Sequence, residues 1–175
     1  MRLLALALAL ALTGCAAQKI DVAVFPAGIY SAQNVDDAAT YDALNFFSGR
    51  SLHPTQAQAA RVRAAVEYLG GEIASNDRFN GLAATTRVQF LQARDEVRQA
   101  LAITPGTSSQ AIVDALVAAA RAPTSQALLT ALDQPFFTLG AQATAARLSA
   151  LPPMPITRTA LEKLWSYEYR TLDAT

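Results

Sequence analysis

Apolar residues recur at helical spacing through most of this chain, and proline and glycine interrupt the spacing at short intervals. The clearest case is the segment from about Asn80 to Ala102, in which one face carries Leu82, Thr86, Phe90, Ala93, Val97 and Leu101. Its charged residues fall outside that face, as in an amphipathic helix with one buried side. Because such a helix must pack its apolar stripe against another element, the pattern requires a domain of several helices.

Capping residues and prolines mark where the first helices should start. Asn34 can cap a helix that runs to Gly49, and Pro54 can stand in the first turn of a second helix. Gly70-Gly71 is expected to weaken or split the far end of that second helix, because glycine is a poor helix former.

Capping residues and prolines also mark the helix boundaries expected in the second half of the chain. Two segments have the form of a capping box and predict the starts of a fourth and a last helix: 107–110 and 159–162. Short helices are expected over 124–133 and 140–151, followed by a rigid connector at Pro152-Pro153-Met154-Pro155. Trp165, Tyr167 and Tyr169 also alternate, so a terminal strand is the alternative to the last helix.

These patterns together predict an all-α fold, a single helical bundle of six or seven helices over residues 34–175 with an extended N-terminal arm. Ile20 to Phe25 is β-prone, but no second convincing strand follows with which it could pair. Two interpretations of residues 15–33 therefore stay open, a free tether and an arm that lies on the domain.

The first fourteen residues have the organisation of a secretory signal. Arg2 is the only charge before Leu3–Leu12, ten residues of leucine and alanine without a polar interruption. As a helix this run would reach about 15 Å, half of the roughly 30 Å that a membrane-spanning helix must cross. A short charged start, a short apolar core and small residues at its end predict a cleaved signal peptide over 1–14.

The signal ends in Leu12-Thr13-Gly14-Cys15, which resembles the lipobox of bacterial lipoprotein precursors. The resemblance implies transfer of a diacylglyceryl group to the Cys15 sulfur, cleavage between Gly14 and Cys15, and acylation of the new amino group. Two or more acyl chains anchor a protein stably to a membrane, whereas one does so only marginally. By the same analogy, Ala16 stands where Asp would favour the inner membrane of Gram-negative bacteria, so the outer membrane is favoured.

Composition limits the function classes that remain. Fourteen basic and fourteen acidic residues cancel, and no basic stripe is visible, so we expect no nucleic acid partner. Cys15 is the only cysteine, which leaves a mature domain without disulfides, thiolate metal ligands or a cysteine nucleophile. We expect no metal site and no cofactor, because no motif for either is recognisable.

Two carboxylates are the only catalytic candidates that the sequence offers, and both are weak. Glu67 and Glu72 could form an acid/base pair of the kind that cleaves sugars, which would suit peptidoglycan in the periplasm. The flanking residues match no muramidase motif, and Glu67 also fits the polar face of a helix. His53, the only histidine, precedes Pro54 at an expected helix start and is better explained as a loop residue.

Three arginines share one face of the expected helix over 80–102 and form the candidate ligand site: Arg87, Arg94 and Arg98. They could bind an anionic group such as a lipid headgroup or a carboxylate. Asp95 and Glu96 are interleaved with them, which favours a solvated surface of salt bridges.

The sequence thus predicts a lipid-anchored, periplasm-facing protein of the bacterial cell envelope, held in the membrane through lipid on Cys15. We expect it to act as a non-catalytic accessory or scaffold module that binds another envelope protein. The alternatives are a carboxylate-dependent hydrolase acting on peptidoglycan and a small-molecule or lipid carrier. A carrier would need an enclosed apolar cavity of several hundred Å³.

Overall fold

Seven α-helices build the protein in the computed structural model, which describes residues 19–30, 34–51, 54–150 and 153–172. In chain order they are α1 (Val35–Phe47), α2 (Gln56–Ser75), α3 (Ala84–Ala100), α4 (Ser109–Ala120), α5 (Ser125–Leu132), α6 (Gly140–Ala150) and α7 (Pro155–Leu172). A short 3-10 helix, Asp77–Phe79, links α2 to α3, and the described residues contain no strand. The all-α prediction is confirmed, and the alternative of a terminal strand is wrong.

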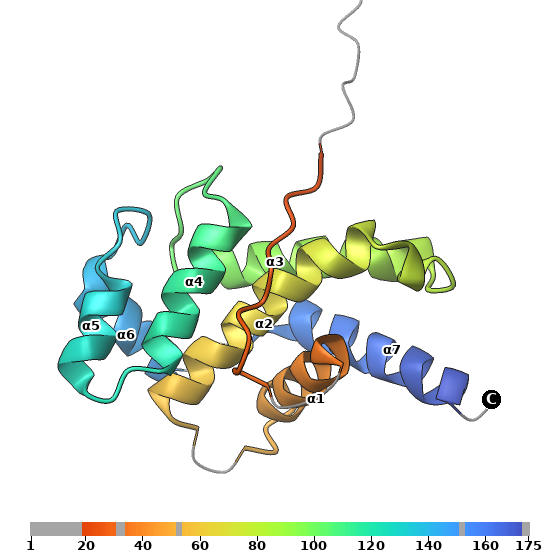
Figure 1. Cartoon of the computed structure of the whole chain (residues 1–175), viewed down its shortest axis with the longest axis horizontal. Coiled ribbons are helices and arrows are strands. Elements are labelled where there is room, and N and C mark those ends of the chain that lie inside the picture. Colours follow the sequence, from red (N-terminus) through yellow and green to blue (C-terminus); the bar gives the residue numbers. More distant parts are fainter. Residues whose placement is uncertain (1–18, 31–33, 52–53, 151–152, 173–175) are drawn as a thin grey trace, which may run out of the picture.

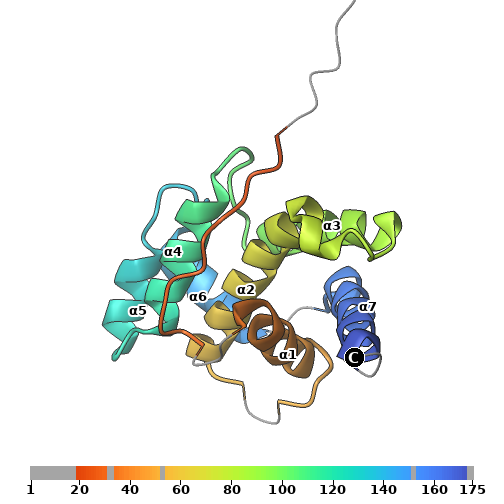
Figure 2. The ribbon, with the colours of Figure 1, turned by 45° about the vertical axis from the view of Figure 1, so that its right-hand side comes forward.

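Helix α2 lies at the centre of the bundle and packs against α1, α3, α4 and α6 (Figures 1 and 2). On one side of it α4, α5 and α6 pack in succession, and on the other α7 contacts both α1 and α3. Because α2 has neighbours around most of its circumference, residues outside its expected apolar stripe are also buried, including Arg63 and Glu67. The sequence pattern placed Glu67 on a polar face, and the structure corrects that placement.

Gly70-Gly71 does not split α2, contrary to expectation, because both glycines are contact points for other elements. A Cβ atom at Gly70 would lie 2.8 Å from the Arg94 Cβ atom of α3, and one at Gly71 would lie 2.7 Å from the Asp21 carbonyl oxygen. The helix runs on to Ser75. The close approach of α3 and of the arm therefore outweighs the intrinsic cost of glycine in a helix, roughly 1 kcal/mol each.

Several predicted helix starts are displaced by a few residues. Helix α2 is capped by Thr55, so Pro54 precedes the cap, and α4 is capped by Ser108 and not by Thr107. Helix α7 begins at Pro155, the last residue of the expected connector, which leaves Thr159 inside the helix. Proline suits the first turn of a helix, and this preference explains the earlier start. The described helices include none that is both long and apolar enough to cross a membrane.

Residues 20–27 form an extended arm that lies across the domain between α4 and the α2–α3 pair (Figures 1 and 2). Ala23 and Phe25 point inward and belong to the same hydrophobic core as the helices. The backbone of Val24 exchanges two hydrogen bonds with the Gln110 side chain of α4, at 2.7 and 3.1 Å. Of the two interpretations left open by the sequence, the structure shows the docked arm.

Candidate ligand-binding cleft beside the N-terminal arm

Glu67 is fully buried on α2 and forms an ion pair with Arg98 of α3. Arg98 donates from Nε to both carboxylate oxygens at 3.1 Å and from Nη2 to Oε1 at 2.5 Å. The guanidinium also donates to the Thr107 carbonyl and the Ser109 hydroxyl. Burial disfavours the charge on Arg98, but the bonds to Glu67 outweigh burial and raise the pKa of Arg98. The pair is an ionic link between α2, α3 and the start of α4.

Glu72, the second carboxylate candidate, is partly exposed and accepts a hydrogen bond from the Asn76 side chain amide at the end of α2. Five residues separate it from Glu67, which places the two side chains about 140° apart around the helix. The structure therefore does not bring the two carboxylates together: one lies in an ion pair in the core, and the other lies near the surface.

The three arginines of α3 all point toward α2 and the arm, but they have different partners. Arg87 donates to the carbonyl oxygens of Ile73 and Ala74, which are among the last carbonyl groups of α2. Arg94 packs against Gly70 and donates from Nη1 to the Asp21 carbonyl oxygen at 3.0 Å. Within the described residues neither Arg87 nor Arg94 forms an ion pair, unlike Arg98.

A cleft of about 710 Å³ opens where the arm meets α3 and the loop before α4. It contains two of the three candidate arginines, Arg94 and Arg98, together with Lys19 at the start of the arm. The acidic residues on its wall are Asp21 and Asp95. Asp21 accepts a hydrogen bond from the Ser109 backbone amide at 2.5 Å, so its carboxylate is occupied at the N-terminus of α4. This cleft is the candidate ligand site of the domain.

A second, apolar depression of about 240 Å³ adjoins the cleft and shares Ile20 and Leu91 with it. Its remaining walls are Ala74 of α2 and the α3 residues Ala84, Arg87 and Val88. The third candidate arginine therefore borders an apolar surface. The two hollows together have one polar half, lined by three basic and two acidic residues, and one apolar half.

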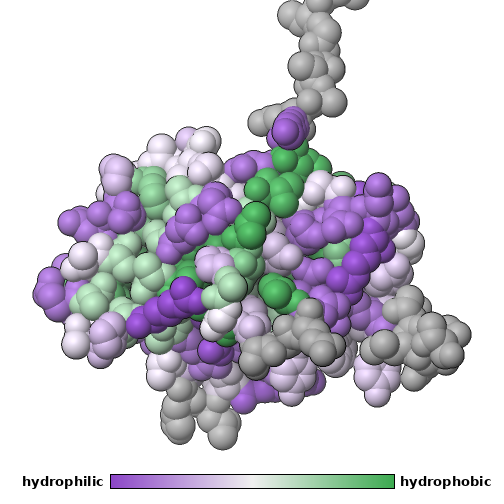
Figure 3. All heavy atoms as spheres, viewed as in Figure 1, coloured by the Kyte–Doolittle hydropathy of each residue, from purple (hydrophilic) through white to green (hydrophobic). Residues whose placement is uncertain are grey.

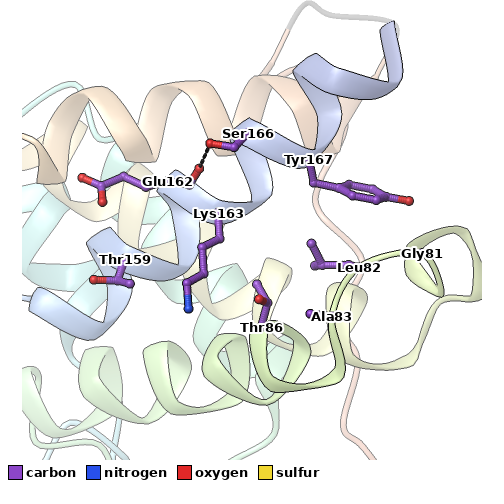
Figure 4. A pocket seen from close by; sticks show the side chains of 9 residues that line it. All are labelled: Gly81, Leu82, Ala83, Thr86, Thr159, Glu162, Lys163, Ser166 and Tyr167. Carbon is purple, nitrogen blue, oxygen red and sulfur yellow. Dashed lines mark hydrogen bonds between the residues drawn. The ribbon is translucent and has the colours of Figure 1, made fainter. Parts of the chain in front are cut away.

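Another cleft, of about 570 Å³, lies between the first turn of α3 and α7 (Figure 4). Lys163 points toward α3, where its ammonium donates to the Gln89 side chain at 2.8 Å. The Ser166 hydroxyl, on another side of α7, donates to the Glu162 carbonyl oxygen of the same helix. The Lys163 ammonium and the Ser166 hydroxyl thus do not converge on one point.

Two acidic residues of α1, Asp36 and Asp42, are bonded to side chains of neighbouring segments. Asp36 is buried and accepts hydrogen bonds from the Tyr68 hydroxyl at 2.6 Å and from Arg78 at 2.7 Å. Asp42 forms an ion pair with Arg61 at 2.7 Å. In the described part of the chain, no three histidine, cysteine, aspartate or glutamate side chains are placed to hold a metal ion. Cys15, with the whole signal segment, and His53 lie outside the described residues.

Sequence reasoning missed the residues of the arm that complete the cleft. Lys19, Ile20 and Asp21 were expected in an arm or tether without a role, because nothing local indicates where such a segment lies. Gln110 was expected to close a capping box, but its side chain bonds to Val24 and Asp114. The one available signal was the β-prone, apolar character of the arm, which is unusual for a solvated linker.

No known protein family, curated protein or solved structure matches this chain.

Proposed function

We propose that this protein is a lipid-anchored module of the bacterial cell envelope that acts by binding and not by catalysis. Lipid on Cys15 holds it in a membrane, with the outer membrane favoured, and the helical domain faces the periplasm and binds another envelope component. The observation that carries the proposal is the run from Leu3 to Cys15, in which an apolar core of signal-peptide length ends in a lipobox-like tetrapeptide.

The packing of the arm supports this proposal. A free linker of some twenty residues would let the domain move far from its anchor. Because the arm is bonded to the domain from Asp21 onward, the chain joins the folded body six positions after Cys15. Such a chain keeps the domain next to the membrane, where a binding surface for envelope components would be useful.

The hydrolase and carrier alternatives receive less support from the geometry. Glu67 has no solvent-exposed surface and is already paired with Arg98, so a substrate cannot reach it without opening the core. The clefts and the depression described above are open at the surface, whereas a carrier needs an enclosed cavity.

The anchor is tested by Cys15→Ala. The substitution should abolish lipidation and cleavage before residue 15, because no other thiol can form the thioether to the lipid. Mass spectrometry of the protein extracted from membranes should show the mature chain plus diacylglyceryl and acyl masses, and should show neither modification nor cleavage for the variant. A variant still cut before residue 15 would refute the lipobox interpretation. Crosslinking of the mature protein in intact cells then identifies the envelope partner.

A further inference from the structure

The start of the arm lies close to the proposed anchor, and this restricts which face of the domain meets the membrane. Lys19 follows Cys15 by only four positions, a span of at most about 14 Å when fully extended. From Asp21 onward the arm is bonded to α3 and α4 and gives no further slack. The surface around Lys19 is therefore held against the bilayer. This step rests on the proposed lipid anchor.

The same surface has the composition of a membrane-contacting face, which we call the anchor-side face: Lys19, Ile20, Arg87, Val88, Leu91 and Arg94. Val88 is 52% exposed although it is a large apolar residue. It borders the apolar depression between Ile20 and Leu91, while Lys19 and Arg94 line the polar cleft beside it. Apolar residues next to cationic side chains are typical of surfaces that lie in the interface of a bilayer.

The apolar character continues along the arm. Three of the seven exposed large hydrophobic side chains among the described residues lie on the arm or on α3 beside it: Val22, Val24 and Val88. Figure 3 shows the arm as a band of hydrophobic residues that starts where the chain leaves the described part and borders a more hydrophilic surface. Part of the exposed apolar surface thus lies along the arm and on the α3 face beside it.

The charges of the face favour an anionic ligand. Arg87 and Arg94 donate to carbonyl and amide oxygens, and within the described residues neither is paired with a carboxylate. The Arg94 Nε atom is buried and has no hydrogen-bond partner among these residues. Of the nearby acids, Glu67 is neutralised by Arg98, Asp21 is bonded to the Ser109 amide, and Asp95 alone is exposed without such a partner.

We propose that the anchor-side face binds anionic phospholipid of the membrane in which Cys15 is anchored. The headgroup phosphate lies against Lys19 and Arg94 in the polar cleft, and the start of the acyl chain lies over the depression formed by Ile20, Val88 and Leu91. A soluble anion would use only the cationic half of this surface. A bilayer of anionic lipid uses both halves, and the short connection to Cys15 holds this surface against the bilayer.

A fluorescent probe on position 88 tests the proposal. The lipidated protein is purified, its acyl mass is verified, and a Val88→Cys variant is labelled with an environment-sensitive dye. The lipid occupies the Cys15 sulfur, so position 88 carries the only free thiol. In phosphatidylethanolamine/phosphatidylglycerol vesicles the emission should shift to the blue and be quenched by spin-labelled lipid. Lys19→Gln should lower the ratio of membrane-bound to solvent-exposed probe about fivefold, since one basic residue near an anionic surface contributes about 1 kcal/mol.

The matched control is Tyr169→Cys with the same dye. Tyr169 is 58% exposed near the end of α7, which lies far from the point where the arm leaves the domain (Figures 1 and 2). Its emission should stay that of a water-exposed dye.

Two results would overturn the proposal. One is water-like emission of the probe at position 88 in anionic vesicles, and the other is an equal blue shift in phosphatidylcholine vesicles. A shift seen only in native membranes would assign the face to a protein partner instead. If mass spectrometry of the purified protein shows no acyl mass, the lipid anchor itself is refuted. This failure is detected before any fluorescence spectrum is recorded.

Discussion

Single residues of this protein show how strongly the environment decides the role of a charge. Glu67 and Glu72 belong to the same helix, yet the first is a buried ion-pair partner and the second a partly exposed group near the helix end. Arg63 is also fully buried, with its guanidinium 5.8 Å from the ring centre of Phe46, and burial lowers the pKa of Arg63 to about 10. The helical pattern of α2 alone would place all of these charges outside the core.

Removal of Arg98 tests the buried ion pair. Arg98→Met should lower the free energy of unfolding by about 3–5 kcal/mol, because the Glu67 charge is then left buried without a partner. The double variant Glu67→Gln/Arg98→Met should recover part of this loss. Urea unfolding measures both effects. As a control, Arg158→Gln removes an exposed pair with Glu162 and should change stability by at most about 0.5 kcal/mol. A loss for Arg98→Met no larger than that would contradict the interpretation.

Glu168 on α7 makes stability depend on pH. Burial and the neighbouring Asp37 carboxylate raise its pKa to about 7, although Arg78 opposes the shift. Because the folded state holds this proton more tightly than the unfolded chain, the folded protein should lose stability as pH rises from about 4.5 through 7. Thermal unfolding at several pH values should show this decline, and Glu168→Gln should flatten it. An unchanged pH profile in the variant would assign the dependence to another group.

At the scale of the elements, contacts between distant segments explain the features that local rules misjudge. The caps are local: Asn34, Ser108 and Thr124 each accept a hydrogen bond from a backbone amide in the first turn of the following helix. Asn34 was predicted as a cap, and Ser108 takes the place of the expected Thr107 one residue away. Gly70-Gly71, in contrast, is explained only by contacts with distant segments, because α3 and the arm approach α2 closely at these two positions.

Gly71→Ala should release the arm and leave α2 intact. The new methyl group would lie 2.7 Å from the Asp21 carbonyl oxygen and 3.0 Å from the Val22 Cα atom, while the helix itself favours alanine by about 1 kcal/mol. Hydrogen exchange of the amides at 21–25 should accelerate. Gly70→Ala serves as the comparison, because its methyl group meets Arg94 and should disturb the α2–α3 contact instead. Unchanged exchange in the arm of Gly71→Ala would show that the arm can shift without detaching.

At the scale of the whole molecule, the arm and the helices form one body. Ala23 and Phe25 share the hydrophobic core with residues from α1 to α7, and the Phe25 ring packs against Tyr30 and Tyr68 at 5.4 Å. The chain therefore enters the domain at a defined point on its surface. If Cys15 carries lipid, that point orients the whole domain relative to the membrane, which is the basis of the experiment with the probe on position 88.

The sequence by itself determined the class of fold, the number of helices to within one, and the approximate positions of their starts. These features depend on neighbours three or four residues apart, so helical spacing, caps and prolines encode them locally. The apolar face of the segment 80–102 was predicted residue by residue for the same reason, and all six of its residues are buried, four of them within α3. The lipobox-like tetrapeptide is likewise a local pattern, and the anchor that it predicts awaits the Cys15→Ala experiment.

Only the tertiary structure decided which candidate residues meet. The sequence placed Arg87, Arg94 and Arg98 on one helix face. It did not show that Glu67 neutralises Arg98, or that the arm brings Lys19 and Ile20 beside the other two arginines. Nor could it decide between a tether and a docked arm, since residues 21 and 109 are bonded across 88 positions of the chain. Contacts between residues so far apart in the sequence depend on how the helices pack, and the local spacing of residue types does not predict them.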